Sequence, residues 1–85
     1  MPRFEIKVRE VKGYCSRDYK VGDAWEVEGF DTPNAFCGGA YTTFFPIIVS
    51  FMAGGQFNFE KDPLCKTNMA CPDCGNVIFS VKKLN

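Results

Sequence analysis

One motif near the C-terminus has the residue types and spacing of a metal site. In MACPDCGNVIF, residues 69–79, Cys71 and Cys74 form a CxxC pair with Pro72 inside it and Gly75 after it. Such a tight turn is typical of a metal knuckle, because it presents two thiolates to the same metal. The motif therefore predicts a thiolate-ligated site, whose other ligands must lie elsewhere in the chain.

The remaining ligands must be single cysteines, because the chain has no second CxxC pair. A structural zinc site commonly uses two facing knuckles, whereas an iron–sulfur cluster tolerates ligands that arrive singly from separate segments. The spacing therefore favours an iron–sulfur cluster, such as a 4Fe–4S cluster, and leaves zinc as the alternative. A single cysteine is also a common buried core residue, so a packing role remains open for each. The predicted metal ligands are Cys15, Cys37, Cys71 and Cys74.

Glycines accompany two of these cysteines. Gly38 and Gly39 follow Cys37, and Gly75 follows Cys74. Without a β-carbon, these residues could let backbone N–H groups approach a thiolate or cluster sulfur. The alternative is that Gly75 only closes a turn and that the glycine pair only lets a helix approach a sheet.

The absence of histidine limits both metal and catalytic chemistry. A transition-metal site must then be built from cysteine, supplemented by carboxylate, water or a partner's ligand. Nucleophilic cysteine catalysis usually needs a base such as histidine. The carboxylates of Glu60, Asp62 and Asp73 show no pattern of an acid–base pair. We therefore expect that this chain is not an enzyme on its own.

Length and composition indicate one folded domain, residues 1–85, and make a stabilising metal plausible. A chain of 85 residues is near the lower size at which apolar burial alone outweighs chain entropy. Its content of 46% hydrophobic and 15% aromatic residues is well above that of a disordered tail. The formal net charge is +0, and no tract of Lys or Arg predicts nucleic-acid binding.

The sequence also predicts a cytoplasmic protein without membrane association. The N-terminal MPRFEIKVRE lacks the apolar region of a secretion signal. The longest apolar run, residues 44–53, is too short to cross a bilayer. Five cysteines, an odd number, fit thiolate chemistry in a reduced cytosol better than a disulfide framework.

Hydrophobic periodicity predicts three strands. Residues 4–8 alternate apolar and charged, and the phase slips at residues 10–11, which predicts a bulge. A tight turn at residues 22–23 precedes a second strand with Trp25 and Val27 inward. A third strand covers NVIFSVKKL near the C-terminus. Basic residues concentrate before residue 21, and acidic residues concentrate at 23–31. We expect that two solvated strand faces pair through these opposite charges. The alternative is that the charges form a docking surface.

The segment between the second and third strands predicts a helix. Thr32 and Pro33 have the types of a cap and first helical position, and the glycines at 54–55 indicate a stop. Pro46 should kink this helix or start a second one. The expected fold class is α+β: a small antiparallel sheet of three or four strands with one kinked central helix across it, which a metal could staple.

Aromatic residues are more numerous than one thin core readily hides. The chain has nine Phe, three Tyr and one Trp, and surplus aromatic side chains favour interfaces. Phe30, Phe57 and Phe59 follow or lie near glycines, and we predict that they contact a partner. The alternative is that all three cap the core between helix and sheet.

The segments KVGDAWEVEGF, FCGGAY and ACPD, with the apolar run around Pro46, carry a resemblance. They resemble a family of small uncharacterised proteins of anaerobic bacteria and archaea with KVGDxWEV, FCGGAY and CPD motifs, over most of the chain. The resemblance implies that Cys15, Cys37 and Cys71 are the shared set. It implies that Cys74 is a local addition to this shared set. It also implies that Cys65, which the sequence places in a loop, is spare, which means that it is not a metal ligand.

Two functions therefore remain in view. In the first, the chain is an iron–sulfur accessory subunit or docking partner of a larger anaerobic enzyme, similar in general role to small cluster-bearing subunits of some glycyl radical enzymes. In the second, it is a zinc-stapled or metal-free binding module whose aromatic surface docks a partner. Metal and sulfide content separates the two.

Overall fold

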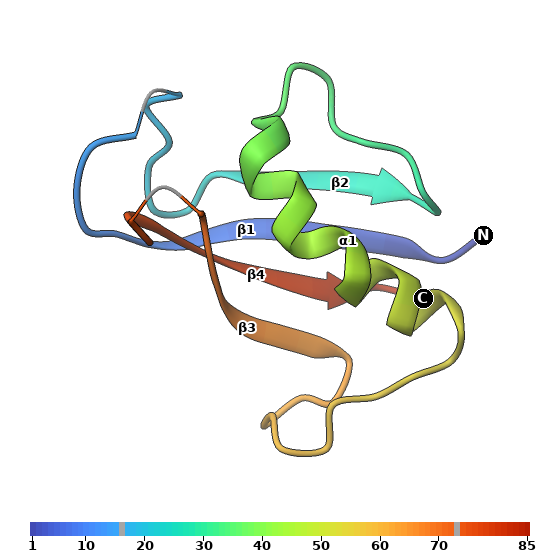
Figure 1. The fold of residues 1–85 in the computed structure, drawn as a ribbon. Helices are drawn as coiled ribbons and strands as arrows, with labels where there is room; N and C mark the ends of the chain where they lie inside the picture. Colours follow the sequence, from blue (N-terminus) through green and yellow to red (C-terminus); the bar gives the residue numbers. More distant parts are fainter. Residues whose placement is uncertain (16, 73) are drawn as a thin grey trace.

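The computed structural model describes residues 1–15, 17–72 and 74–85, and it places one helix across one face of a single sheet (Figure 1). The sheet order is β2-β1-β4-β3, and every neighbouring pair is antiparallel. The predicted α+β class is confirmed. The elements in chain order are β1 (Arg3–Val11), β2 (Ala24–Glu28), α1 (Gly38–Met52), β3 (Cys65–Ala70) and β4 (Val77–Lys83).

The two strands from opposite ends of the chain form the centre of the sheet. β1 pairs with β4, and the register shifts between Val8 and Glu10, where the sequence predicted a bulge. The inward side chains of both strands are fully or almost fully buried. On the outer face, Arg3 of β1 forms an ion pair with Glu26 of β2, as the predicted charge pairing requires. The inward residues are Phe4, Ile6, Val8, Val77, Phe79 and Val81.

The helix begins later than the sequence predicted. It starts at Gly38 with Cys37 as the N-cap residue, not at Thr32 and Pro33. Pro33 instead opens a turn, in which the N–H of Phe36 donates to the Pro33 carbonyl. Ala35 in this turn has a φ of 57°, which a right-handed helix does not allow. The prediction of the helix start was therefore wrong by more than one turn.

The rest of the helix follows its apolar pattern. One helix runs through the exposed Pro46, so the alternative of a second helix at this residue is wrong. Gly54 has a φ of 83° and ends the helix as predicted. Five side chains on one side of α1 are buried against the sheet, and Phe44 contacts Phe79 with ring centroids 4.9 Å apart. These buried residues are Ala40, Tyr41, Phe44, Ile48 and Phe51.

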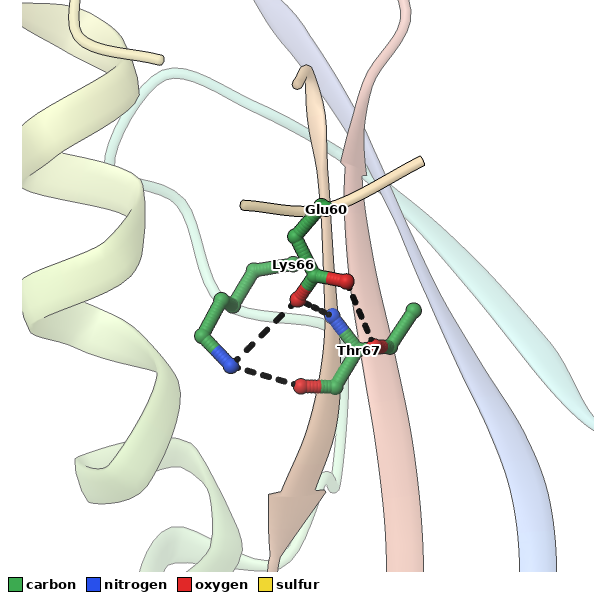
Figure 2. Close-up of polar contacts among 3 residues, drawn as sticks. All are labelled: Glu60, Lys66 and Thr67. Carbon is green, nitrogen blue, oxygen red and sulfur yellow. Dashed lines mark hydrogen bonds and ion pairs between the residues drawn. The ribbon is translucent and has the colours of Figure 1, made fainter. Parts of the chain in front are cut away.

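Strand β3 is the element without a clear signal in the sequence. Its residues CKTNMA are mostly polar and do not alternate cleanly, and Asn68 has a φ of 59° where the register with β4 shifts. The strand is held from its open edge by Glu60, whose carboxylate accepts hydrogen bonds from the N–H and the hydroxyl of Thr67, both 2.9 Å (Figure 2). Lys66 lies 3.5 Å from the same carboxylate.

Candidate metal centre

Three of the four predicted ligands line one cavity. Cys15, Cys37 and Cys71 contribute to a cavity of about 90 Å³. They come from the loop after β1, the start of α1 and the turn between β3 and β4, which lie at the same end of the sheet (Figure 1). The other lining residues are Tyr14, Tyr19, Gly39, Ala40, Pro72, Val77 and Phe79.

Cys37 occupies the N-cap position of α1. Its side chain makes no capping hydrogen bond, so its sulfur is not used to satisfy the helix. The N-terminal end of a helix carries partial positive charge and unpaired N–H groups, which stabilise a nearby thiolate. Cys37 therefore lies at the end of α1 that borders the cavity.

Cys71 lies where the β3–β4 hairpin closes. Its N–H donates to the carbonyl of Val77 at 2.9 Å, and the N–H of Val77 points back to the Cys71 sulfur at 3.4 Å. A backbone N–H directed at sulfur is the kind of outer contact that tunes thiolate ligands of metals and clusters. The hairpin thus fixes the direction of the Cys71 side chain.

The loop that carries Cys15 is attached to the same hairpin by Asn76. The Asn76 side-chain amide donates to the carbonyl of Tyr14 at 3.0 Å, and the backbone carbonyl of Asn76 accepts from the N–H of Lys12 at 2.6 Å. Arg17 ties the other end of this loop to the turn before α1 through the carbonyl of Ala35, 3.1 Å away. Cys15 is thereby held beside Cys71 and Cys37 despite its distance from them in sequence.

Tyr19 connects the cavity to the aromatic core. Its ring contacts Trp25 at a centroid distance of 4.9 Å and Phe36 at 5.6 Å. Burial raises the pKa of the Tyr19 phenol, and the hydrogen bond that its oxygen accepts from the Cys37 N–H offsets part of this rise. Sequence reasoning gave Tyr19 no role, because nothing in its local spacing indicates that it lies between two cysteines.

The fourth predicted ligand, Cys74, is not among the residues that line the cavity. Its side chain is exposed, and its φ of 57° places it in a left-handed turn beyond Cys71. Within the described part of the chain, no three His, Cys, Asp or Glu side chains are grouped closely enough to hold a metal ion. Asp73, named above among the carboxylates, lies outside the described residues. The structure thus brings three predicted ligands to one cavity and leaves the fourth at its outside.

Cys65 belongs to a different surface. It begins β3, rather than lying in a loop as predicted, and it pairs in register with Lys82. It lines a polar groove with Lys82 and Asp62, apart from the other cysteines. Burial raises the pKa of the Cys65 thiol, and the charge of Asp62 raises it further. Cys65 therefore lies apart from the cavity that Cys15, Cys37 and Cys71 line, and the expectation that it is spare stays a prediction.

The glycines near the cavity differ in what a β-carbon would meet. At Gly39, an added β-carbon would lie 3.9 Å from the Cys37 sulfur and 3.8 Å from Pro72. At Gly38, it would meet nothing within 4 Å. Gly75 has a φ of 66°, and its N–H closes the turn onto the carbonyl of Cys71 at 3.1 Å. Gly39 therefore keeps space open beside a thiol, and Gly75 serves the turn.

The predicted partner-binding aromatics are not equivalent. Phe57 is half-buried and packs edge-on against the core residue Phe51 at 5.3 Å. Phe59 is 77% exposed, and Phe30 is 48% exposed. Phe30 contacts Phe45 on the outer side of α1 at 5.8 Å, a neighbour that the sequence did not indicate. Phe30 and Phe59 are thus accessible to a partner, whereas Phe57 also supports the core.

Comparison with known proteins returns no relative: no family model, curated protein or solved structure matches the chain. None of the helices in the described residues is long and apolar enough to span a membrane. The case for a function therefore depends on the geometry of the cavity and on the chemistry of its cysteines.

Proposed function

We propose that this chain is a small iron–sulfur protein that serves as a cytoplasmic accessory subunit or docking partner of a larger anaerobic enzyme, without catalysis of its own. The observation that carries this proposal is that Cys15, Cys37 and Cys71, from three distant segments, line one cavity. The resemblance to small proteins of anaerobes supports the anaerobic setting.

A cluster suits this cavity better than a single zinc ion. Zinc requires ligand sulfurs about 2.3 Å from one atom, and the described side chains include no group that is close enough for that. The inorganic core of a cluster spans wider gaps between single cysteines. A cavity of about 90 Å³ has room for a group as large as several water molecules. The arrival of the three cysteines singly from separate segments is the feature that favours a cluster over zinc in this proposal.

The backbone near two of these cysteines also suits a bound cluster. The N-terminus of α1 faces the site through Cys37, and the Val77 N–H is directed at the sulfur of Cys71. Backbone N–H groups near sulfur are contacts that metal-ligating and cluster-ligating cysteines commonly receive. A cluster bound by these cysteines would bring together two loops and the start of α1, which couples metal binding to folding.

Anaerobic purification followed by iron, acid-labile sulfide and zinc analysis tests the proposal. We expect stoichiometric iron and sulfide, and brown protein. Cys71→Ser should lose the iron, whereas Cys65→Ser, the same chemical change on a separate surface, should keep it. Protein with zinc and no iron would favour the zinc-stapled module, and protein with neither metal would end the proposal.

The docking role depends on exposed aromatic side chains. Phe30 and Phe45 form an exposed pair at 5.8 Å, and Phe59 is exposed near the start of β3. Native co-purification with wild-type chain and with Phe30→Ser tests whether this pair binds a larger protein. Recovery of a defined partner by wild type and its loss with Phe30→Ser would support the docking role, and monomer alone in repeated native preparations would count against it.

A further inference from the structure

A polar groove lies on the face of the sheet that α1 does not cover. Its volume is about 370 Å³, which is within the usual range for small-molecule sites. Side chains of the central strands β1 and β4 line it, together with the loop before β3 and the first half of β3. It shares no described lining residue with the cysteine cavity. Four of its lining residues are the groove cations: Lys7, Arg9, Lys61 and Lys82.

Ser80 is the buried polar residue of this groove. It is 3% exposed, and it points away from the helix because its neighbours Phe79 and Val81 point toward it. The described contacts give its hydroxyl no hydrogen bond. The oxygen keeps access to the groove, because no side-chain oxygen or nitrogen of the described residues is fully enclosed without a partner. Buried hydroxyl groups nearly always have a hydrogen-bond partner, so the partner of Ser80 must come from the groove.

Two of the groove cations flank Ser80 in the sheet. Lys7 lies directly opposite Ser80 in the register of β1 and β4, and the β-carbons of such pairs are about 5 Å apart. Lys82 lies two residues beyond Ser80 on β4, so it points to the same face. A group that accepts a hydrogen bond from the Ser80 hydroxyl would therefore lie within reach of both ammonium groups.

Cys65 adds no negative charge to the groove at neutral pH. Burial raises the pKa of its thiol, and the charge of Asp62 raises it further. The charges of Arg9 and Lys82 act on this pKa in the opposite direction, so both cations lie near this side of the groove. The thiol is thus a neutral neighbour of two cations.

Two of the three carboxylates that line the groove are already engaged. Glu60 accepts hydrogen bonds from the N–H and the hydroxyl of Thr67 and lies 3.5 Å from Lys66 (Figure 2). Asp62 accepts a hydrogen bond from the N–H of Leu64 at 3.0 Å. In the part of the chain that the structure describes, none of the groove cations forms an ion pair or a side-chain hydrogen bond. The groove therefore offers positive charge that the protein itself does not neutralise.

We propose that this groove binds a phosphate group, either as free phosphate or as the terminal group of a small phosphorylated molecule. The dianion forms ion pairs with Lys7 and Lys82 and accepts a hydrogen bond from the Ser80 hydroxyl. Its several oxygens and two charges match this set of donors better than a carboxylate does. Glu5, the third lining carboxylate, lies directly opposite Lys82. A run of phosphates, as in nucleic acid, would meet this negative charge beyond its first group.

Isothermal titration calorimetry of the full chain at constant ionic strength tests the proposal, with inorganic phosphate and glycerol phosphate as probes. We expect saturable binding that Ser80→Ala weakens by at least about tenfold, as for a hydrogen bond to a charged group. Lys82→Gln should also weaken it. Lys20→Gln, the same change at an exposed lysine outside the groove, is the matched control and should bind as the wild type does. Circular dichroism checks that each variant is folded.

The two probes distinguish the sources of the phosphate group. Tighter binding of glycerol phosphate would indicate a phosphorylated molecule, tighter binding of inorganic phosphate would indicate the free ion, and both results support the proposal. No saturable binding of either probe would overturn it, as would acetate that binds as tightly as phosphate. Equal weakening by Lys20→Gln and Lys82→Gln would show attraction to charge without a site, and binding of a short oligonucleotide alone would assign the groove to nucleic acid instead. Either of these two results would also overturn it.

Discussion

The backbone N–H of Cys37 donates a hydrogen bond to the phenol oxygen of Tyr19 at 3.1 Å. This bond joins the N-cap residue of α1 to Tyr19, eighteen residues earlier, in the loop that also carries Cys15. It also satisfies an N–H that the helix itself cannot satisfy, because the first N–H groups of a helix have no partner within it. Tyr19 thereby fixes one side of the cavity without contributing a ligand atom.

Tyr19→Phe should lower the stability of the protein while leaving the proposed cluster in place. The substitution keeps the ring contacts with Trp25 and Phe36 but leaves the part-buried Cys37 N–H without its acceptor. The expected loss is about 1 kcal/mol in the free energy of unfolding, measured by chemical denaturation. Iron content equal to the wild type is the control. Loss of the iron together with an unchanged free energy of unfolding would contradict the positioning role.

Glu60→Gln should destabilise the protein near neutral pH and have little effect in acid. The N–H and then the hydroxyl of Thr67 hold the pKa of the Glu60 carboxyl below its usual value. A carboxylate whose pKa is lower in the folded chain stabilises the fold above its unfolded pKa of about 4.3. This stabilisation is lost as the pH falls through the lower, folded value.

The measurement is the denaturant midpoint of both proteins from neutral to acidic pH. The midpoints should differ at neutral pH and converge as Glu60 of the wild type becomes protonated. Glu5→Gln on the open face of the sheet is the matched control, because the described contacts include no hydrogen bond to its carboxylate. A difference between wild type and Glu60→Gln that persists unchanged into acid would show that charge on Glu60 does not stabilise β3.

Strands β1, β2 and β4 and the buried side of α1 could be predicted, because their apolar residues repeat at short, regular intervals in the sequence. Phe4, Ile6 and Val8 repeat every second residue, and the buried residues of α1 recur at helical spacing. The helix start could not be predicted from Thr32 and Pro33, since proline also suits the turn that Pro33 opens. β3 was missed because an edge strand with a bulge and a polar sequence carries no periodic signal.

The candidate site shows a similar division. The residue types predicted a cysteine set, and the separation of Cys15, Cys37 and Cys71 in sequence is what made a cluster the favoured chemistry. The outward position of Cys74 could not be read from the CxxC motif, because the motif fixes the spacing of two thiols but not the turn between them. The roles of Tyr19 and Asn76 depend on contacts between distant segments, which no local pattern indicates.

Phe57 and Phe59 should respond differently to removal of their rings. Phe57 packs on Phe51, so Phe57→Ala should lower the free energy of unfolding by about 2 kcal/mol, less than the loss for a fully buried ring. Phe59 is exposed, and the Lys66 ammonium lies 5.7 Å from the centroid of the Phe59 ring. Phe59→Ala should therefore lower the free energy of unfolding by no more than about 1 kcal/mol. Chemical denaturation of both variants checks this, and equal losses would contradict the assignment of Phe57 to the core.

Gly39→Ala should impair cluster binding without harming the fold. An added β-carbon would lie in ordinary contact with the Cys37 sulfur at 3.9 Å and with Pro72 at 3.8 Å. It would therefore fit the protein without a clash, yet fill space beside a thiol that is a proposed ligand of the cluster. Alanine is also a better helix former than glycine by up to about 1 kcal/mol, so the fold itself should be at least as stable.

Gly38→Ala is the matched control for this prediction. It adds the same methyl group one residue earlier in α1, where the β-carbon meets nothing within 4 Å and does not line the cavity. We expect iron and sulfide per chain to fall in Gly39→Ala and to equal the wild type in Gly38→Ala, with unchanged circular dichroism in both. Equal iron in the two variants would show that the space beside Cys37 is not where the cluster lies. A loss of helical signal in Gly39→Ala alone would show that the residue is needed for the fold and not for the site.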